Sequence, residues 1–551
     1  MRLKSWILIA ISLAVILSGL SLFQNYRVQL PGIINRLKDP ILENQAVNWR
    51  ESARSSDGLQ DDVPPNIVVI LVDDLGINDI STFGGGVADG FLQTPNIDAL
   101  AENGAVFTNG YAGNATCAPS RAAIMTGRYA TRFGFEFTPA PVAFHRLLGG
   151  FEYGSREAIY NAELETETIP LSEQGLPSSE ITMAELLREE GYRTLFLGKW
   201  HLGESEEFQP QSQGFDEWLG FLPGAALFLP VDDPDVVNSI HDFDPVDQYL
   251  WPNLSFAVRH NGSQRFQPDR YMTDYLADNA VSAIQANAHN PFFLYLSLNA
   301  PHTPLQALRS DFEALSGIEN ERLRVYAAMI LAVDRAVGQV SQALEEAGVA
   351  DNTLIIFSSD NGGAGYVGFA DINAPFRGWK ASFFEGGIRV PMFMQWPDRI
   401  PAGTQIEHPA AHVDIFTTAA HAAGATLPQD RVLDGQNLMT LIENPDAPSS
   451  ERSLYWRSGH YRAYLQDGWK LQISDHPSAV WLFNLNEDPT EQVNLAEDEP
   501  ERLAAMLNAY EALNADQIDP IWPSLVAPPI YIDRHILEEK REDDVYVHWP
   551  N

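Results

Sequence analysis

The stretch Ile67-Val68-Val69-Ile70-Leu71-Val72 is an unbroken run of β-branched and aliphatic residues, and Asp73-Asp74 follows it directly. A strand with one face in water alternates polar and apolar residues, whereas a strand buried on both faces does not need to. The run therefore predicts a central strand of a parallel sheet. Three further runs of the same kind lie at residues 192–197, 292–298 and 353–358.

Helical patterns separate these runs. They lie at residues 183–190, 272–288 and 322–346, and the last has an apolar face formed by Tyr326, Met329, Ile330, Val333, Val337, Val340 and Leu344. Strands that alternate with helices typically build a parallel sheet with helices on both faces. We therefore predict an α/β fold with a large, mainly parallel sheet sandwiched by helices.

The pattern changes after about residue 440. Short, turn-bounded runs at residues 453–456, 469–473 and 481–485 predict a small antiparallel sheet, followed by a helix at 501–513. This indicates a smaller C-terminal α+β subdomain. The predicted organisation is a signal segment at 1–23, a linker or stalk at 24–64, a large α/β domain at 65–440, the C-terminal subdomain at 441–520 and an irregular tail at 521–551.

The first residues have the pattern of a targeting signal. Arg2 and Lys4 precede an uncharged, mostly apolar stretch from Trp6 to Phe23, which is nearly as long as a membrane span. We expect an uncleaved signal anchor, with a cleaved signal peptide as the alternative. The positive charges before it predict that the rest of the chain is exported. We expect either the periplasm of a bacterium, with residues 6–23 as an anchor in the inner membrane, or secretion.

The composition excludes one class of partner. The 551 residues include 74 acidic and 35 basic ones, which gives a formal net charge of −39. A body this acidic repels nucleic acid, and no stripe of Lys and Arg offsets the charge.

Polar residues follow each of the four buried runs, where open α/β sheets bind their ligands. The four endings are Asp73-Asp74, Lys199-Trp200-His201, Ala300-Pro301-His302 and Asp360-Asn361-Gly362. The side-chain oxygens of Asp73, Asp74, Asp360 and Asn361 suit a hard cation such as Ca²⁺ or Mg²⁺. Lys199, His201 and His302 are donors that suit an anion. A cation beside such donors can hold and activate a charged ester.

Cys117 is the only cysteine of the chain. A lone cysteine is usually an inert, buried apolar residue. Here, however, Pro119 fits the first turn of a helix and Gly127 can end it. Cys117 is thus predicted at a helix N-terminus, where backbone N–H groups favour anions. By itself this pattern allows a thiol nucleophile with a low pKa.

The segment Cys117-Ala118-Pro119-Ser120-Arg121, followed by Thr126-Gly127-Arg128, resembles the modification signature of the formylglycine-dependent (type I) sulfatases. These arylsulfatase-like enzymes belong to the alkaline phosphatase superfamily. The resemblance covers most of residues 65–500, including the four strand endings and Arg377-Gly378-Trp379-Lys380. It implies an alkaline phosphatase-like fold and a sulfuric ester hydrolase.

The resemblance also implies a role for each residue. A separate formylglycine-generating enzyme would oxidise Cys117 to formylglycine (3-oxoalanine), which is held as its hydrate. Asp73, Asp74, Asp360, Asn361 and residue 117 would bind a divalent metal, calcium in most relatives, with Mg²⁺ as the alternative. The hydrate attacks sulfur, with Asp360 as the activator. Arg121 and Lys199 would hold residue 117 and the sulfate oxygens. His302 and Lys380 would bind sulfate and protonate the leaving alcohol. His201 would be the base that lets the covalent sulfate ester collapse and release sulfate.

The substrate follows less directly from the residues. We expect a sulfate ester of a carbohydrate, with aryl sulfates as a simpler alternative. Segments 137–179 and 222–270 are expected to form the pocket walls. Weaker candidates for substrate contacts are Trp251, His260, Arg265, Arg270, Arg457 and His460.

Two alternatives remain open. The first is a phosphonate or phosphodiester hydrolase of the same superfamily, which tends to carry His at the place of Asn361 and to use manganese. The second is a non-catalytic protein that binds sulfated glycans, against which the complete set of site residues argues.

Overall fold

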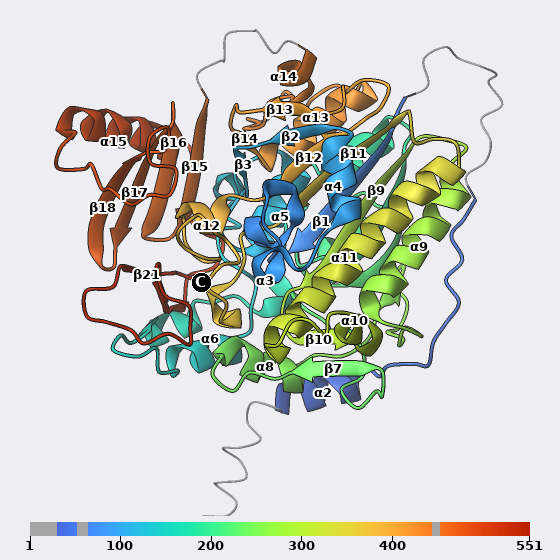
Figure 1. Ribbon diagram of the computed structural model, residues 1–551, viewed down its shortest axis with the longest axis horizontal. Helices are drawn as coiled ribbons and strands as arrows, with labels where there is room; N and C mark the ends of the chain where they lie inside the picture. The colour runs from blue at the N-terminus through green and yellow to red at the C-terminus, as the bar shows by residue number, and fades with distance from the viewer. Residues whose placement is uncertain (1–29, 52–63, 444–451) are drawn as a thin grey trace, which may run out of the picture.

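The computed structural model describes residues 30–51, 64–443 and 452–551 (Figure 1). Its main feature is a nine-stranded sheet with the order β13-β2-β12-β11-β1-β9-β5-β6-β8. Five neighbouring strands of this sheet are parallel, namely β11 (Thr353–Ser359), β1 (Asn66–Asp73), β9 (Phe292–Pro301), β5 (Arg193–Lys199) and β6 (Glu217–Phe221). The predicted parallel sheet is confirmed, and the four apolar runs form four adjacent strands at its centre.

Antiparallel pairs lie toward both edges of this sheet. Strand β12 (Met392–Gln395) runs antiparallel to β11 and to β2 (Ala105–Phe107), whereas β13 (Thr404–Ile406) is parallel to β2. At the other edge, β8 (Arg259–His260) is antiparallel to β6. The sheet is therefore mixed, with a parallel centre.

Strand β1 shows why its sequence does not alternate. Val68, Ile70 and Val72 are buried in one core and Ile67, Val69 and Leu71 in a second core on the opposite face. The first core includes residues of α4 (Pro95–Glu102), α9 (Met272–Asn287) and α11 (Glu321–Glu346), and the second includes residues of α5 (Cys117–Thr126), α7 (Met183–Glu189) and α13 (Val413–Ala423). In Figure 1, α9 and α11 lie in front of the sheet. Helices thus cover both faces, as predicted.

Shorter elements surround the sheet. The helices are α2 (Leu30–Lys38), α3 (Val87–Gly90), α6 (Val142–Gly149), α8 (Pro245–Asn253), α10 (Arg309–Ala314), α12 (Glu385–Ile388) and α14 (Met439–Glu443). The small strands are β3 (Gly110–Tyr111) with β14 (Ala410–Ala411), and β7 (Val236–Ser239) with β10 (Leu305–Leu308).

The C-terminal part forms the expected antiparallel sheet. Its strands are β15 (Ser453–Ser458), β16 (Tyr461–Gln466), β17 (Trp469–Asp475) and β18 (Ser478–Asn484), in that order, and α15 (Pro500–Asn514) packs on them. The sequence reading missed β16. The sequence signal for this strand is Asp467-Gly468, which is a typical hairpin turn. Both residues have a positive φ, of +52° and +76°, and they connect β16 to β17 in a two-residue turn.

The last residues are not irregular, which corrects the prediction for residues 521–551. Strand β19 (Val526–Ala527) pairs with β4 (Ile159–Tyr160), and β20 (Pro529–Tyr531) pairs with β21 (Tyr546–His548). Trp549 is buried in the core of the C-terminal sheet. Because β19 pairs with a segment more than 360 residues away, a local sequence pattern could not indicate it.

The expected stalk is also wrong for the part that the structure describes. Leu42 exchanges backbone hydrogen bonds with Arg265 and Gln267, and Trp49 is buried in the main core. Residues 30–51 therefore pack on the catalytic body, since these scattered apolar side chains find partners there. In the described ranges, no helix has both the length and the apolar composition needed to cross a bilayer. The expected anchor at residues 6–23 lies outside those ranges and stays a prediction.

A buried network of charges joins the C-terminal sheet to the catalytic body. Lys470 on β17 donates to Glu385 at 2.7 Å and lies 3.0 Å from Glu491, and all three side chains are fully buried. Tyr111 and Arg389 also donate to Glu385, at 3.1 and 3.2 Å. Because Glu385 begins α12, five residues after Lys380, this network holds the loop that carries Lys380.

Candidate active site

Four neighbouring strands end at one edge of the sheet and bring the predicted polar residues together. β1 ends at Asp73, β5 at Lys199 and β9 just before His302, while β11 leads into Asp360 and Asn361. Cys117 begins α5 at the same place, with Thr116 as its N-cap residue, and Gly127 ends the helix with a φ of +66°. Each of these site residues is buried.

Asp73 is paired with Lys199. The Lys199 ammonium donates to the two Asp73 oxygens at 2.9 and 2.7 Å, and neither side chain has any exposed surface. The thiol of Cys117 lies 3.6 Å from the nearer Asp73 oxygen. Burial raises the pKa of Asp73 well above its usual value, with help from Asp360 and against the opposing effect of Lys199.

Asp74 is the centre of a second set of contacts. Lys380 donates to its oxygens at 2.7 and 2.9 Å and also lies 3.1 Å from the Cys117 sulfur. Asn361 and Tyr366 donate to Asp74 as well, at 2.8 Å each. Burial opposes the ionisation of Asp74, but Lys380, His302 and Lys199 outweigh it and lower the pKa of this carboxyl. Two adjacent carboxyls thus have pKa values shifted in opposite directions, which is typical of functional sites.

Arg121 lies one helical turn after Cys117 and binds Asp360. Its Nε and Nη2 donate to one Asp360 oxygen at 2.9 and 2.7 Å, and its Nη1 donates to the Lys199 carbonyl at 3.1 Å. The other Asp360 oxygen accepts a hydrogen bond from the Asp74 backbone at 3.1 Å. Arg121 therefore links α5 to the ends of β11 and β5.

The backbone around the site is strained at three places. Asp74, His201 and Ala381 have φ values of +62°, +59° and +67°. This left-handed region is uncommon for residues other than glycine. Such conformations cluster at active and ligand-binding sites, where the surrounding structure holds them. Here they lie in or beside three of the strand-end and loop segments that form the site.

The two histidines are neutral in this environment. Burial lowers the pKa of His201, with Lys199 and Arg121 acting in the same direction, and burial also lowers the pKa of His302. The Nδ1 of His302 is hydrogen-bonded to the Thr303 carbonyl at 2.5 Å, so this nitrogen carries the proton. Its Nε2 is then free to accept, and it lies 3.7 Å from Asp74.

The donor set fits a divalent metal ion. Ligating atoms of Asp73, Asp74, Cys117 and His302 lie within 4.8 Å of one another, and no other described group of His, Cys, Asp and Glu residues is so arranged. The buried Oδ1 of Asn361 has no hydrogen-bond partner. Crowded carboxylates and an unpartnered amide oxygen favour a hard cation. Asp360 is not one of these four; one of its oxygens is bound to Arg121 and the other accepts from the Asp74 backbone.

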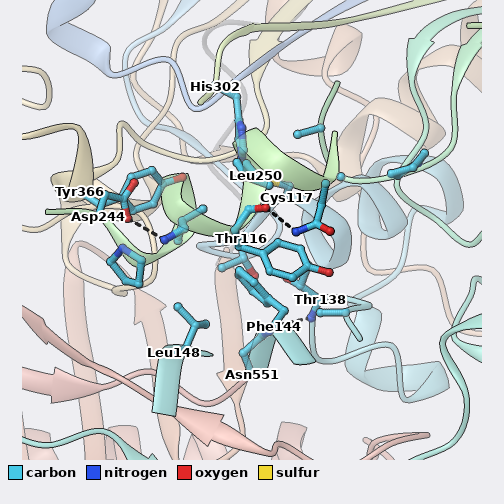
Figure 2. A pocket seen from close by; sticks show the side chains of 18 of the residues that line it. Thr116, Cys117, Thr138, Phe144, Leu148, Asp244, Leu250, His302, Tyr366 and Asn551 are labelled. Carbon is cyan, nitrogen blue, oxygen red and sulfur yellow. Dashed lines mark hydrogen bonds between the residues drawn. The ribbon is translucent and has the colours of Figure 1, made fainter. Parts of the chain in front are cut away.

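A cavity of about 1170 Å³ opens from this cluster. Cys117, His201, His302 and Lys380 line its inner end, and Figure 2 shows Phe144, Leu148 and Leu250 around it. Its walls include many residues from both segments that were expected to form them, 137–179 and 222–270. The C-terminal residues 528–551 add a further wall that was not expected.

Comparisons with known proteins agree with this geometry. The sulfatase family profile matches residues 65–425. The chain belongs to the sulfatase family. A second profile, N-sulphoglucosamine sulphohydrolase, C-terminal, matches residues 378–515. The chain is a sulfuric ester hydrolase with the fold of that family, so both of these predictions are confirmed.

Two curated relatives illustrate the range of this family. N-acetylgalactosamine-6-sulfatase from Homo sapiens is 30% identical over 503 residues, which cover 84% of this chain and 88% of that protein. Steryl-sulfatase from Homo sapiens is 32% identical and covers 77% of each chain. Among solved structures, Ps i-CgsB in complex with k-i-k-neocarrahexaose is 33% identical with a TM-score of 0.70, covering 83% of this chain and 94% of that one.

Most of the weaker sequence candidates lie away from the cavity. Of the six, only Arg265 lines the cavity, where Asp39 pairs with it at 2.9 Å. Arg457 is bound to Glu136, and Arg270 pairs with Asp269 and Asp278 on the surface. The remaining three, Trp251, His260 and His460, do not line the cavity.

Sequence reasoning missed Tyr366 and His412. Tyr366 contacts Asp74 and Lys380, but it lies in a single 3-10 turn, Gly365–Val367, which is too short to have a sequence signal of its own. His412 is buried with Nδ1 2.9 Å from the Ser120 hydroxyl and Nε2 3.0 Å from the Ser358 hydroxyl. It thus ties α5, one turn after Cys117, to strand β11.

The stability of this sulfatase is expected to fall in acid partly because of His412. Burial lowers the pKa of His412 to about 3, against about 6.5 in an unfolded chain. The unfolded state therefore binds more protons between these values, and stability is lost as the pH falls below about 6.5. Between pH 7 and pH 5, we expect the free energy of unfolding of a His412→Asn variant to fall by about 2 kcal/mol less than that of the native protein. Urea unfolding at both pH values measures this, with exposed His289→Asn as the control; equal losses in all three proteins would contradict it.

Proposed function

We propose that this sulfatase hydrolyses sulfate esters of carbohydrates through a formylglycine formed from Cys117, and releases inorganic sulfate. The observation that carries the proposal is the position of the single cysteine. Cys117 lies at a helix N-terminus, 3.1 Å from Lys380 and close to both Asp73 and Asp74, at the inner end of a large cavity. The thiol itself is a poor nucleophile here, since burial raises the pKa of Cys117 and Asp360 adds to the effect.

Oxidation by a formylglycine-generating enzyme would replace the thiol by an aldehyde, whose hydrate has two hydroxyl groups at the position of the sulfur. This group supplies one hydroxyl for attack on sulfur and a second whose deprotonation expels the sulfate. The side chains around Cys117 fit the other tasks. Arg121 orients Asp360, the proposed activator, and Lys199 lies beside Asp73 to hold a sulfate oxygen.

Proton transfers fall to the remaining residues of the cavity. His302 and Lys380 line it next to Cys117 and are proposed to bind sulfate and give a proton to the leaving alcohol. His302 would first take up a proton at Nε2, which the negative charge of a bound sulfate favours. His201 is neutral, and its buried Nδ1 has no partner. We assign it the removal of a proton from residue 117 in the last step, so that sulfate leaves and the aldehyde returns.

We further propose that the metal is Ca²⁺, held by Asp73, Asp74, Asp360, Asn361 and residue 117. These are oxygen donors, which Ca²⁺ and Mg²⁺ prefer. When bound, the ion would offset the repulsion between the carboxylates and polarise a sulfate oxygen. The lysines now on Asp73 and Asp74 would then be free to turn toward the sulfate.

Calcium is expected to stabilise the protein in a way that depends on Asn361. A ligand that binds only the folded state adds about 2.7 kcal/mol at one hundred times its dissociation constant. The midpoint temperature of thermal unfolding of chelator-treated protein should rise when Ca²⁺ is added. In Asn361→Ala this rise should be absent or should require a far higher Ca²⁺ concentration. Asn287→Ala is the matched control, since Asn287 is also buried with an unpartnered Oδ1 but lies on α9, outside the site. An Asn361→Ala protein with the native response to Ca²⁺ would remove this residue from the metal site.

The carbohydrate substrate class is supported by the relatives. One is named for N-acetylgalactosamine 6-sulfate chemistry and one solved structure holds k-i-k-neocarrahexaose. The test is sulfate release, measured by ion chromatography, from sulfated oligosaccharides, an aryl sulfate and an aryl phosphodiester. Matured protein should act on at least one sulfated glycan. Turnover of aryl esters alone would contradict the carbohydrate assignment, and a strong preference for the phosphodiester would contradict the sulfatase one.

A further inference from the structure

Two helices present apolar side chains to the cavity. Phe144 and Leu148 lie four residues apart on α6, so they share one face of that helix. Val246 and Leu250 are related in the same way on α8. The two helices pack on each other, and the ring of Phe144 meets that of Tyr249 edge-on at 5.0 Å between centroids. All five residues line the cavity, and all except Leu148 are only partly buried. They are called the apolar wall below.

The apolar wall belongs to the same cavity as the nucleophile. Figure 2 shows Phe144, Leu148 and Leu250 around the cavity that Thr116 and Cys117 also line. The cluster behind Cys117 consists of buried residues, so the alcohol part of an ester held there must extend into the cavity. With about 1170 Å³, the cavity has room for an alcohol with several fused rings or a long alkyl chain.

Amide side chains beside the apolar wall are engaged within the protein. Asn253, the last residue of α8, accepts a hydrogen bond from the backbone of α2 and donates one to the Tyr249 carbonyl, both at 2.7 Å. Asn551 accepts from the Thr138 backbone at 2.9 Å and lies 3.4 Å from the ring of His145 on α6. A polyhydroxylated body needs hydrogen-bond partners when it leaves water, whereas an apolar body needs none. The surroundings of this wall therefore favour an apolar body.

The three arginines that line the cavity are held in ion pairs. Arg259 and Arg265 both bind Asp39, the latter at 2.9 Å. Arg534 lies 3.3 Å from Asp544. A second anionic group on the substrate would have to compete with these carboxylates. The pairs therefore favour a substrate whose sulfate is its only charge.

We propose that this sulfatase has a further activity, the hydrolysis of sulfate esters of large apolar alcohols, whose alkyl or fused-ring body lies on the apolar wall. The inference rests on the proposed function for the chemistry at residue 117 and adds a second class of ester to the carbohydrate esters. Sulfur passes from the alcohol oxygen to an oxygen of the formylglycine hydrate, and the alcohol leaves with a proton. Sulfate is then expelled, and water restores the hydrate. Burial of the body against exposed apolar side chains supplies the binding free energy.

Three aryl esters test this, each used below the concentration at which it forms micelles. 4-Hexylphenyl sulfate has five more methylene groups than 4-methylphenyl sulfate, and 4-(2-methoxyethoxymethyl)phenyl sulfate has the length of the hexyl ester but two ether oxygens in its chain. A methylene that is fully buried adds about fourfold to binding, so matured native protein should show at least about 30-fold higher kcat/KM for the hexyl ester than for either other ester. The gain should come from a lower KM with a similar kcat, because the chain makes the same contacts before and during the reaction.

Two variants and a control locate the effect. Phe144→Ser and Leu250→Ser each replace part of the apolar wall by a hydroxyl group, and each should reduce the gain for the hexyl ester by about tenfold. Phe91→Ser is the matched control, since Phe91 is 52% exposed and does not line the cavity, and it should keep the native gain.

Equal kcat/KM of the native protein for the hexyl and ether esters would overturn the inference, whether or not the variants fold. A native gain in both Phe144→Ser and Leu250→Ser would overturn it as well. If the native protein released sulfate from none of the three esters and from no glycan, the proposed function would fail instead.

Discussion

Replacing Cys117 with alanine is expected to lower kcat for sulfate release by at least about 10⁴-fold, because loss of a covalent nucleophile removes the entire reaction path. The side chain is small and 3% exposed, so the variant should fold. The measurement is sulfate release from 4-nitrophenyl sulfate and from the best glycan substrate, by protein produced together with a formylglycine-generating enzyme.

Native protein produced without that enzyme is the matched control, since its residue 117 keeps the thiol. It should be as inactive as Cys117→Ala. The mass of the peptide that contains residue 117 should show a cysteine in this preparation and the formylglycine in native protein produced with the enzyme. Full activity of unmodified protein would show that the thiol itself, or another residue, is the nucleophile. Activity retained in Cys117→Ala would exclude residue 117 altogether.

Replacing Lys470 with methionine is expected to destabilise the protein by about 3–5 kcal/mol, because it leaves Glu491 as a buried carboxylate without a cation and Glu385 with Arg389 as its one remaining cation. Lys470 lies 2.7 and 3.0 Å from these two groups, and none of the three is exposed to solvent. Burial already raises the pKa of Glu491 to about 7 with Lys470 present. The free energy of unfolding, from urea titration at pH 7, measures the loss.

The triple variant Lys470→Met, Glu385→Gln, Glu491→Gln is the control for this experiment. It removes the unpaired charges together with the lysine, so it should recover a large part of the lost stability. A single variant within about 1 kcal/mol of the native protein would show that the network contributes little. If the triple variant were even less stable than the single one, the hydrogen bonds of Glu385 to Tyr111 and Arg389 would matter more than the charges.

Much of the fold could be predicted because local sequence patterns define its central strands. The four apolar runs became adjacent strands because a strand between two helical layers must be apolar on both faces, and Val68 and Val69 indeed pack into opposite cores. The pairing of β19 with β4 and the packing of Trp49 could not be predicted. Both depend on contacts between segments far apart in the chain, which leave no periodic pattern.

The candidate site divides in the same way. Asp73, Lys199, His302 and Asp360 could be grouped from the sequence because each follows a buried strand, and parallel strands end at one edge. Cys117 could be recognised from its motif. Tyr366 and His412 could not, because their surroundings come from segments far apart in the chain, whose paths the local sequence does not define.

What the sequence alone determined is the family, the sheet and the residue types that meet at its edge, since strand periodicity and a short motif are local properties. The tertiary structure decided how those residues are used. It paired Lys199 with Asp73 and Lys380 with Asp74, and it directed Arg121 to Asp360. The physical reason is that charge pairing and burial depend on distances of a few ångströms, which only the packed chain defines.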